Sequence, residues 1–293
     1  MATSRVGTVQ ANGIRFSTLE QGDGPLVLCL HGFPDHAHSF HHQLPALAAA
    51  GFRAVAPFMR GYAPSDPAPD GRYQSAVLAL DIVELITALG YESAHLFGHD
   101  WGALASYGAA IAAPNRVKKL VTAAVPHGPA VLNAFLTSYE QQRRSWYMFF
   151  FQTPFADAAV AHGEFAFLER LWRDWSPTWA IPPSEIDALK ATFRQPGVLQ
   201  AALAYYRCTL NPEKQDPELV DLQTAMSMAP IQAPSMVFHG AMDGCMGVDL
   251  LDGMEAMFPH GLRKVVVPGA GHFVHRERPD IVNTELIDFL RAD

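Results

Sequence analysis

The chain of 293 residues contains few cysteines and no excess of basic residues. Its three cysteines, Cys29, Cys208 and Cys245, are odd in number and widely separated. They favour free thiols in a reducing compartment over a disulfide framework, and none has the spacing of a metal site. Lysine and arginine number 21 against 29 aspartates and glutamates, which gives a formal net charge of -8. The few paired cations form no basic stripe, so nucleic acid is not an expected partner.

Long hydrophobic segments are also lacking. Residues 1–5 contain no apolar run of the kind found in a signal peptide, and no stretch reaches the roughly 18 apolar residues of a membrane span. Hydrophobic residues nevertheless make up 49% of the chain, which is ample for a core. We therefore expect a cytoplasmic protein without a membrane span, and the sequence leaves open whether it is a monomer or a homodimer.

One short turn, Gly98-His99-Asp100-Trp101-Gly102, organises the chain. Residues 93–97 before it predict a buried strand, and the small apolar residues 103–113 after it predict a helix packed closely on a sheet. This succession is typical of a nucleophile elbow, whose middle side chain points into a pocket. Most elbows carry serine, but Asp100 is ionised without the help of a base. A carboxylate is suited to displacement at a saturated carbon, which opens a strained ring or expels a halide.

Strand and helix patterns alternate in the first part of the chain. A hairpin is predicted at residues 6–10 and 14–20, and buried strands at residues 25–30, 52–57, 93–97 and 120–125. Helices are predicted at residues 39–50, with Ser39 as the N-cap, and at residues 75–89. This alternation predicts an α/β fold with a mostly parallel, doubly wound sheet.

The alternation stops between residues 131 and 228, where aromatic residues are frequent and no strand pattern occurs. Strand patterns resume at residues 234–238 and 264–267, and a last helix is predicted at residues 280–290. We interpret residues 131–228 as a helical lid, or cap, inserted above the C-terminal edge of the sheet. Residues 1–130 and 229–293 are then the two parts of the core.

Two further candidate catalytic residues lie in loops after the resumed strands. Asp243 follows the first of these strands and His272 follows the second, which gives the chain order nucleophile, acid, base. This is the order of the α/β-hydrolases, and each residue falls where loops converge at the sheet edge. We assign the oxyanion hole to the backbone N–H groups of Phe33 and Trp101.

Several motifs carry a resemblance that covers essentially the whole chain. They are Gly98 to Gly102 with Asp100 at its centre, His31-Gly32-Phe33-Pro34, Arg60-Gly61-Tyr62 followed by Ser65, and Gly271-His272-Phe273 with Glu277 and Pro279. In these motifs the sequence resembles the epoxide hydrolases of the α/β-hydrolase fold. The resemblance implies that Tyr147 and Tyr206, in the predicted lid, grip and protonate the epoxide oxygen.

The resemblance also implies a reaction in two steps. Asp100 attacks an epoxide carbon to form a covalent alkyl ester, and His272, oriented by Asp243, activates the water that hydrolyses this ester to a vicinal diol. The expected partners are a lipophilic epoxide and water, and no metal or organic cofactor is needed. The expected pocket residues are Phe33, Trp101, Phe150, Phe151 and Phe273.

Other functions remain open at this point. Haloalkane and haloacetate dehalogenases use the same aspartate nucleophile, although the former usually have Asn at the position of Phe33 and the latter usually have Arg at that of Trp101. A non-catalytic protein that binds a small ligand on this fold is a second alternative, and a serine esterase would need a serine at the turn. The sequence leaves open the physiological epoxide, the regio- and enantioselectivity, the biological role and whether the Phe33-Pro34 peptide bond is cis.

Overall fold

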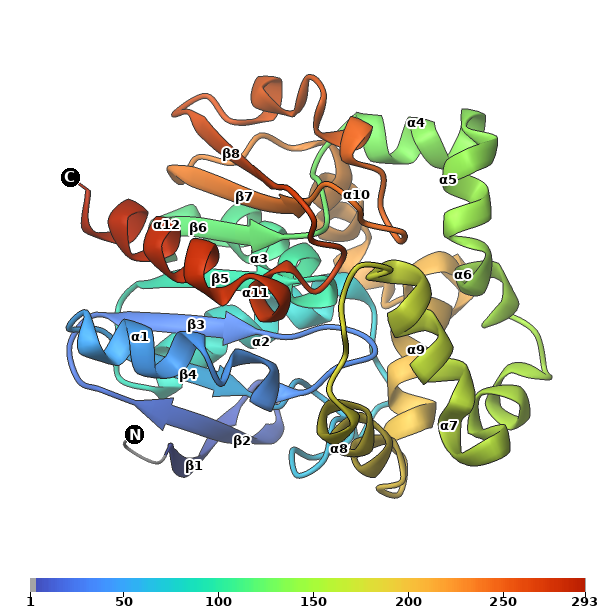
Figure 1. Cartoon of the computed structure of the whole chain (residues 1–293). Helices are drawn as coiled ribbons and strands as arrows, with labels where there is room; N and C mark the ends of the chain where they lie inside the picture. The colour runs from blue at the N-terminus through green and yellow to red at the C-terminus, as the bar shows by residue number, and fades with distance from the viewer. Residues whose placement is uncertain (1–3, 293) are drawn as a thin grey trace.

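Eight strands form one sheet in the computed structural model, which describes residues 4–292 (Figure 1). The strand order is β1-β2-β4-β3-β5-β6-β7-β8, in which β2 pairs antiparallel with both β1 and β4 and every later pairing is parallel. The strands are β1 (Arg5–Ala11), β2 (Ile14–Gln21), β3 (Leu26–Leu30), β4 (Arg53–Pro57), β5 (Ala94–His99), β6 (Val117–Ala123), β7 (Ser235–Gly240) and β8 (Leu262–Val267). The predicted fold class, a mostly parallel sheet of the α/β-hydrolase type, is confirmed.

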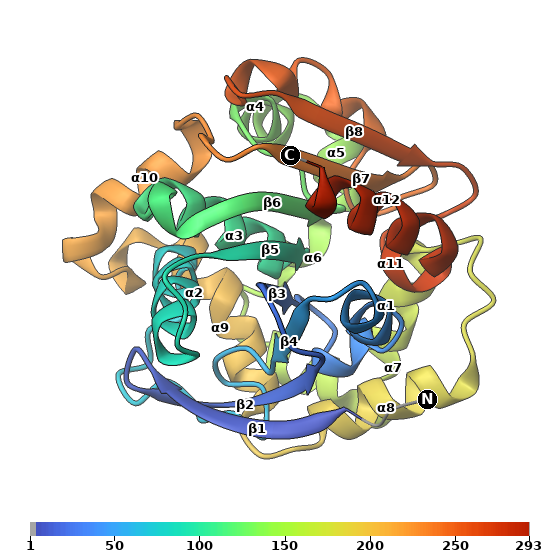
Figure 2. The same cartoon turned by 90° about the vertical axis from the view of Figure 1, so that its left-hand side faces the viewer.

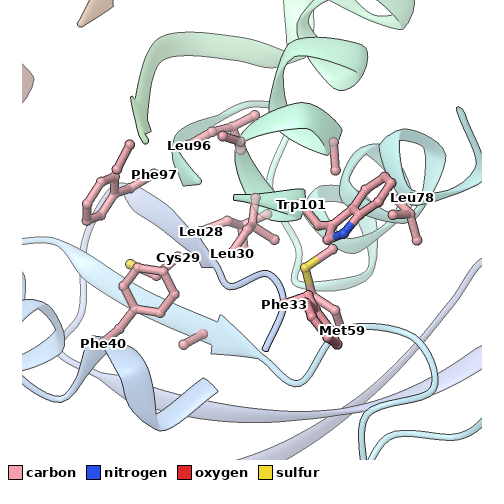
Figure 3. Packing of buried hydrophobic residues seen from close by; sticks show 14 of the residues in the cluster. Leu28, Cys29, Leu30, Phe33, Phe40, Met59, Leu78, Leu96, Phe97 and Trp101 are labelled. Atoms are coloured by element: carbon pink, nitrogen blue, oxygen red, sulfur yellow. The ribbon is translucent and has the colours of Figure 1, made fainter. Parts of the chain in front are cut away.

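Strand β3 is buried along its whole length, as its uninterrupted apolar sequence predicts. Phe40 and Phe97 lie on one side of this strand and Trp101 lies on the other (Figure 3). The Phe40 and Phe97 rings meet edge to face with centroids 5.6 Å apart, so aromatic packing closes the core beneath the turn that carries Asp100.

Helices cover both faces of the sheet (Figure 2). One face carries α1 (Gln43–Ala49), α11 (Val274–Glu277) and α12 (Pro279–Arg291), and the other carries α2 (Ser75–Ala88) and α3 (Trp101–Ala112). The helix predicted from Ser39 begins only at Gln43, so the predicted N-cap is wrong. Ser39 lies instead in the short 3-10 helix η1 (Ala37–Phe40). Its hydroxyl donates to the Asp35 carboxylate at 2.5 Å and therefore does not cap α1.

The segment between β6 and β7 is helical wherever it has regular structure. We call α4 to α10 the inserted helices: α4 (Pro129–Thr137), α5 (Tyr139–Arg144), α6 (Trp146–Phe150), α7 (Ala156–Trp175), α8 (Pro183–Phe193), α9 (Val198–Leu210) and α10 (Val220–Met228). Backbone angles at residues 162–165 are not helical and kink α7. The C-terminal ends of the parallel strands point towards these helices (Figure 1). The domain boundaries given above stay a prediction.

Short 3-10 helices occupy several of the connections. They are η2 (Pro114–Arg116), η3 (Pro212–Lys214), η4 (Pro217–Leu219), η5 (Val248–Leu251) and η6 (Met254–Met257). Over residues 4–292, no helix combines the length and the hydrophobicity that crossing a membrane requires.

Candidate active site

The turn between β5 and α3 holds Asp100 in an unusual backbone conformation, with φ 52° and ψ -118°. The two flanking glycines are required by close backbone approaches. A Cβ on Gly102 would lie 1.9 Å from the carbonyl oxygen of Leu30, and one on Gly98 would lie 2.3 Å from the carbonyl oxygen of Gly102. Only glycine fits at both positions, so the turn is tight enough to project Asp100 from the end of the strand.

The Asp100 carboxylate contacts the loop after β3 and the loop after β8. Its Oδ1 accepts a hydrogen bond of 2.6 Å from the N–H of Phe33, and its Oδ2 lies 3.6 Å from Nε2 of His272. A Cβ on Gly32 would lie 2.2 Å from Asp100 Oδ1 and 2.5 Å from the nitrogen of Trp101. The N–H of Phe33 thus points at the elbow carboxylate and the Trp101 nitrogen borders the same small space, while the oxyanion hole itself stays a prediction. The Phe33-Pro34 peptide bond is cis.

His272 is held between two carboxylates. Its Nδ1 lies 2.9 Å from Oδ2 of Asp243, while Nε2 faces Asp100. The other oxygen of Asp243 accepts from the N–H groups of Cys245 and Met246 at 2.7 and 3.0 Å. The Asp243 and His272 side chains are buried. Their hydrogen bonds fix the imidazole ring so that Nε2 can exchange a proton with a group beside Asp100.

The charges of this group reinforce one another. Burial alone would lower the pKa of His272, but the Asp243 and Asp100 carboxylates raise that pKa to about 10. Burial likewise opposes ionisation of Asp243, yet His272 and its other partners keep the pKa of Asp243 below its ordinary value. In the absence of substrate, His272 is therefore an imidazolium and Asp243 a carboxylate. Loss of the charge on Asp100 would lower the pKa of His272, so the ring could release its extra proton and become available as a base.

Two backbone and side-chain anchors hold the loops of His272 and Asp243 together. The carbonyl oxygen of Trp175, at the end of α7, accepts from the N–H of His272 at 3.1 Å and from that of Gly244 at 3.0 Å. The Glu277 carboxylate accepts from the N–H of Gly271 at 2.9 Å and from the Ser176 hydroxyl at 2.6 Å. The inserted helices thus take part in positioning His272, which sequence patterns did not indicate.

The two tyrosines expected to bind the substrate oxygen come from different inserted helices. Tyr147 lies on α6 and Tyr206 on α9, and their rings meet edge to face with centroids 5.7 Å apart. Oη of Tyr147 lies 3.4 Å from Sγ of Cys245, whereas the buried Tyr206 hydroxyl donates no hydrogen bond among the described residues. Burial raises the pKa of both phenols well above the usual range, so both keep their protons at neutral pH.

A cavity of about 230 Å³ joins these side chains. Asp100, Trp101, Tyr147, Tyr206 and Cys245 line it together. The rest of its wall is mostly apolar and is formed by Leu104, Val125, Pro126, His127, Gly128, Val131, Leu132, Phe135, Met148, Thr209, Leu210, Met226, Ser227 and Met246. The structure therefore brings both tyrosines and the elbow aspartate to one apolar chamber.

Of the expected pocket residues, Trp101 lies on this wall and the other four do not. Phe33 packs edge to face on Phe151, with centroids 5.4 Å apart, and Phe150 stacks on Phe167 at 5.8 Å. Phe273 packs on Trp172 at 4.7 Å. The contacts of Phe33 and Phe273 join the inserted helices to the sheet edge, whereas the contact of Phe150 lies within the inserted helices. The wall residues of α4 and α10 were missed because an apolar residue on a helix gives the same pattern whether it faces a core or a cavity.

Two buried groups of residues bring possible metal ligands within 4.8 Å of one another. In the first, formed by Asp35, His99 and His275, Oδ1 of Asp35 accepts from Arg276 at 3.1 Å. That guanidinium would repel a cation. In the second, formed by Asp243, Cys245 and His272, the Asp243 oxygens are already bound by the imidazole and by two N–H groups. Neither arrangement favours a metal ion over the contacts that are present.

The fold defines an α/β-hydrolase, and an aspartate stands at the centre of its elbow turn. Residues 25–279 match the family model of the alpha/beta hydrolase fold. The chain is 32% identical to epoxide hydrolase 3 of Siraitia grosvenorii, over 97% of each chain. Its structure superposes on that of an epoxide hydrolase from Bacillus megaterium, solved in complex with an inhibitor, with a TM-score of 0.84, 28% identity and coverage of 98% and 100%. Epoxide hydrolase A from Mycobacterium thermoresistibile gives a TM-score of 0.82 at 29% identity, over 99% of each chain. The chain belongs to the α/β-hydrolase family and, within it, to the epoxide hydrolases.

Proposed function

We propose that this protein hydrolyses a lipophilic epoxide to a vicinal diol through a covalent ester on Asp100. One observation carries the proposal: the elbow carboxylate and two neutral phenols, Tyr147 and Tyr206, line the same apolar cavity. A carboxylate supplies the nucleophile, and protonated phenols supply what an alkoxide leaving group requires. The three buried free cysteines support a reducing, cytoplasmic location.

Ring opening uses Asp100 and the two phenols. Asp100 attacks one epoxide carbon, the bond from that carbon to the ring oxygen breaks, and the oxygen takes a proton from a tyrosine. The carboxylate becomes a neutral ester, so one of the two charges that raise the pKa of His272 is lost. His272 can then release its extra proton to solvent and become the base for the second step.

Hydrolysis of the ester uses the sheet edge. His272 takes a proton from a water molecule, the resulting hydroxide attacks the ester carbonyl, and the N–H groups of Phe33 and Trp101 stabilise the oxyanion. The tetrahedral intermediate then expels the diol oxygen, which takes the proton back from His272. The proton left on the Asp100 carboxyl returns to the tyrosine phenolate, and His272 regains a proton from solvent, which restores the starting charges.

Intact-mass spectrometry of the His272→Ala variant tests this proposal. With hydrolysis blocked, mixing with styrene oxide should give an adduct equal in mass to the whole epoxide, mapped to the peptide that contains Asp100. The matched control, Asp100→Asn in the same background, should give no adduct. Asn keeps a side-chain oxygen for the Phe33 N–H and tolerates a positive φ, so its fold should be preserved.

The same experiment separates the competing functions. An adduct formed only from phenethyl bromide, with the mass of the alkyl group and no bromine, would establish a dehalogenase. Tight binding of the epoxide without any adduct, and without turnover by the wild type, would establish a binding protein. An adduct on a serine would refute the role of Asp100.

A further inference from the structure

We propose that Cys245 is a positioning residue for ring opening, whose thiol donates to the Tyr147 phenol oxygen while that phenol transfers its proton to the epoxide oxygen. The inference rests on the proposed function and deepens it. It assigns different tasks to the two phenols: Tyr147, supported by the thiol, is the proton donor, and Tyr206 binds the ring oxygen.

The backbone of Cys245 fixes the thiol in place. Its N–H donates to the Asp243 carboxylate at 2.7 Å, and its carbonyl oxygen accepts from the Gln141 side chain of α5 at 2.9 Å. Sγ lies 3.4 Å from Oη of Tyr147, and the residue is 1% exposed. A single residue therefore connects the acid of the sheet edge to the phenol of the inserted helices.

The two phenols differ in their surroundings although both line the cavity. Within residues 4–292 the buried Tyr206 hydroxyl has only the Trp101 side chain near enough to lower its pKa by a hydrogen bond, so its proton is available to a ligand in the cavity. The Tyr147 hydroxyl has the thiol beside it. When a phenol donates its proton to the substrate, negative charge forms on the phenol oxygen. A hydrogen-bond donor already beside that oxygen stabilises the charge without a rearrangement of the surrounding groups.

The thiol keeps its own proton throughout the step. Burial raises the pKa of Cys245 well above its ordinary value, with the nearby carboxylates adding to the effect. As the bond from Asp100 to carbon forms and the epoxide C–O bond breaks, the Tyr147 proton moves to the alkoxide and the S–H group donates to the phenolate. The proton returns from the Asp100 carboxyl after hydrolysis, so no further reactant is needed.

Substitution by alanine isolates the thiol. Ala at position 245 keeps the backbone N–H that binds Asp243 and the carbonyl that binds Gln141, so the contact with Tyr147 is lost together with the volume of the sulfur, which Val restores. In the His272→Ala background, rapid quenching and intact-mass detection measure the rate constant of ester formation from styrene oxide. Cys245→Ala should lower this rate constant about 3- to 10-fold, the size expected for one hydrogen bond. Cys245→Val should give a similar loss, and Cys245→Ser should recover part of the rate.

A mutant cycle shows whether the thiol acts through Tyr147. Cys245→Ala should cause no further loss when Tyr147→Phe is already present, and its full loss when Tyr206→Phe is present. With His272 intact, the rate constant of ester hydrolysis should not change in Cys245→Ala. Cys208→Ala, which removes a thiol that does not line the cavity, is the matched control and should leave both rate constants unchanged.

The outcomes distinguish this inference from the proposed function. Two results would refute the role of the thiol and leave the proposed function intact. One is a normal rate of ester formation in Cys245→Ala and Cys245→Val, and the other is an equal fall in that rate with and without Tyr147. A parallel fall in ester hydrolysis would show that residue 245 acts through Asp243 and would likewise refute the role of the thiol. Failure of the His272→Ala protein itself to form any ester would overturn the proposed function.

Discussion

The sheet edge and the inserted helices hold their parts of the site in different ways. At the sheet edge, Asp100, Asp243 and His272 are joined to one another or to backbone N–H groups by contacts of 2.6 to 3.6 Å. In the inserted helices, the Tyr206 hydroxyl donates no hydrogen bond within the described part of the chain, and the Tyr147 hydroxyl contacts the Cys245 thiol. The half assigned to ester hydrolysis is complete without substrate, whereas the half assigned to ring opening has unused hydrogen-bonding capacity.

This difference indicates what a substrate oxygen would gain in the cavity. The Tyr206 hydroxyl lines the cavity and donates no hydrogen bond within residues 4–292. An epoxide oxygen in the cavity can accept that proton in a hydrogen bond, typically worth about 0.5–1.5 kcal/mol. The inserted helices therefore favour binding of an oxygen acceptor, while the sheet edge is arranged for the step that follows.

Removing both phenols should produce the largest effect. In the His272→Ala background, Tyr147→Phe with Tyr206→Phe should lower the rate of ester formation on the order of 10³-fold, because the leaving oxygen loses its proton donor. Quenched-flow mass spectrometry measures the rate. Tyr139→Phe, which removes an exposed phenol of α5, is the control and should have no effect. Unchanged ester formation in the double phenylalanine variant would contradict the division of labour between the two regions.

Replacing Asp243 should affect the other half of the reaction, and less strongly. Asp243→Asn keeps an acceptor for the Cys245 N–H but lacks the charge that supports the His272 imidazolium, so ester hydrolysis should slow about 100-fold. Ester formation should change little, and the ester should accumulate during turnover, where intact mass detects it. The control Asp252→Asn alters an exposed aspartate after the same strand. Equal slowing of both steps would show that the two regions are not separable.

The sheet-edge residues were predictable because local patterns determine where they lie. Asp100, Asp243 and His272 each follow a parallel strand, and the C-terminal ends of such strands meet at one edge, so the pattern alone brings these residues together. Asp100 also has glycines at the two positions where a Cβ would collide with backbone. The structure adds the distances and the bond from Phe33.

The inserted helices were less predictable for a physical reason. A strand fixes its neighbours through backbone hydrogen bonds, but a helix packs through side chains, and several packings satisfy the same apolar pattern. No sequence pattern predicts the contacts of the Cys245 thiol or the Trp175 carbonyl. The pattern at Phe150 and Phe273 fits a pocket and a core equally well. Tyr147 and Tyr206 were singled out only through the family resemblance.

The charge network of the sheet edge should also appear in the pH dependence of stability, as the smallest of these effects. The pKa of His272 rises from an ordinary 6.5 to about 10 in the folded protein. Its contribution to the free energy of unfolding is therefore fully present below pH 6.5 and is lost as the pH rises towards 10. In denaturant titrations across this window, the wild type should lose stability relative to His272→Gln. Tyr206→Phe should follow the wild type, because the Tyr206 phenol stays protonated there. Parallel curves for the wild type and His272→Gln would mean that His272 is neutral in the resting protein, and that its basicity does not depend on the charge of Asp100.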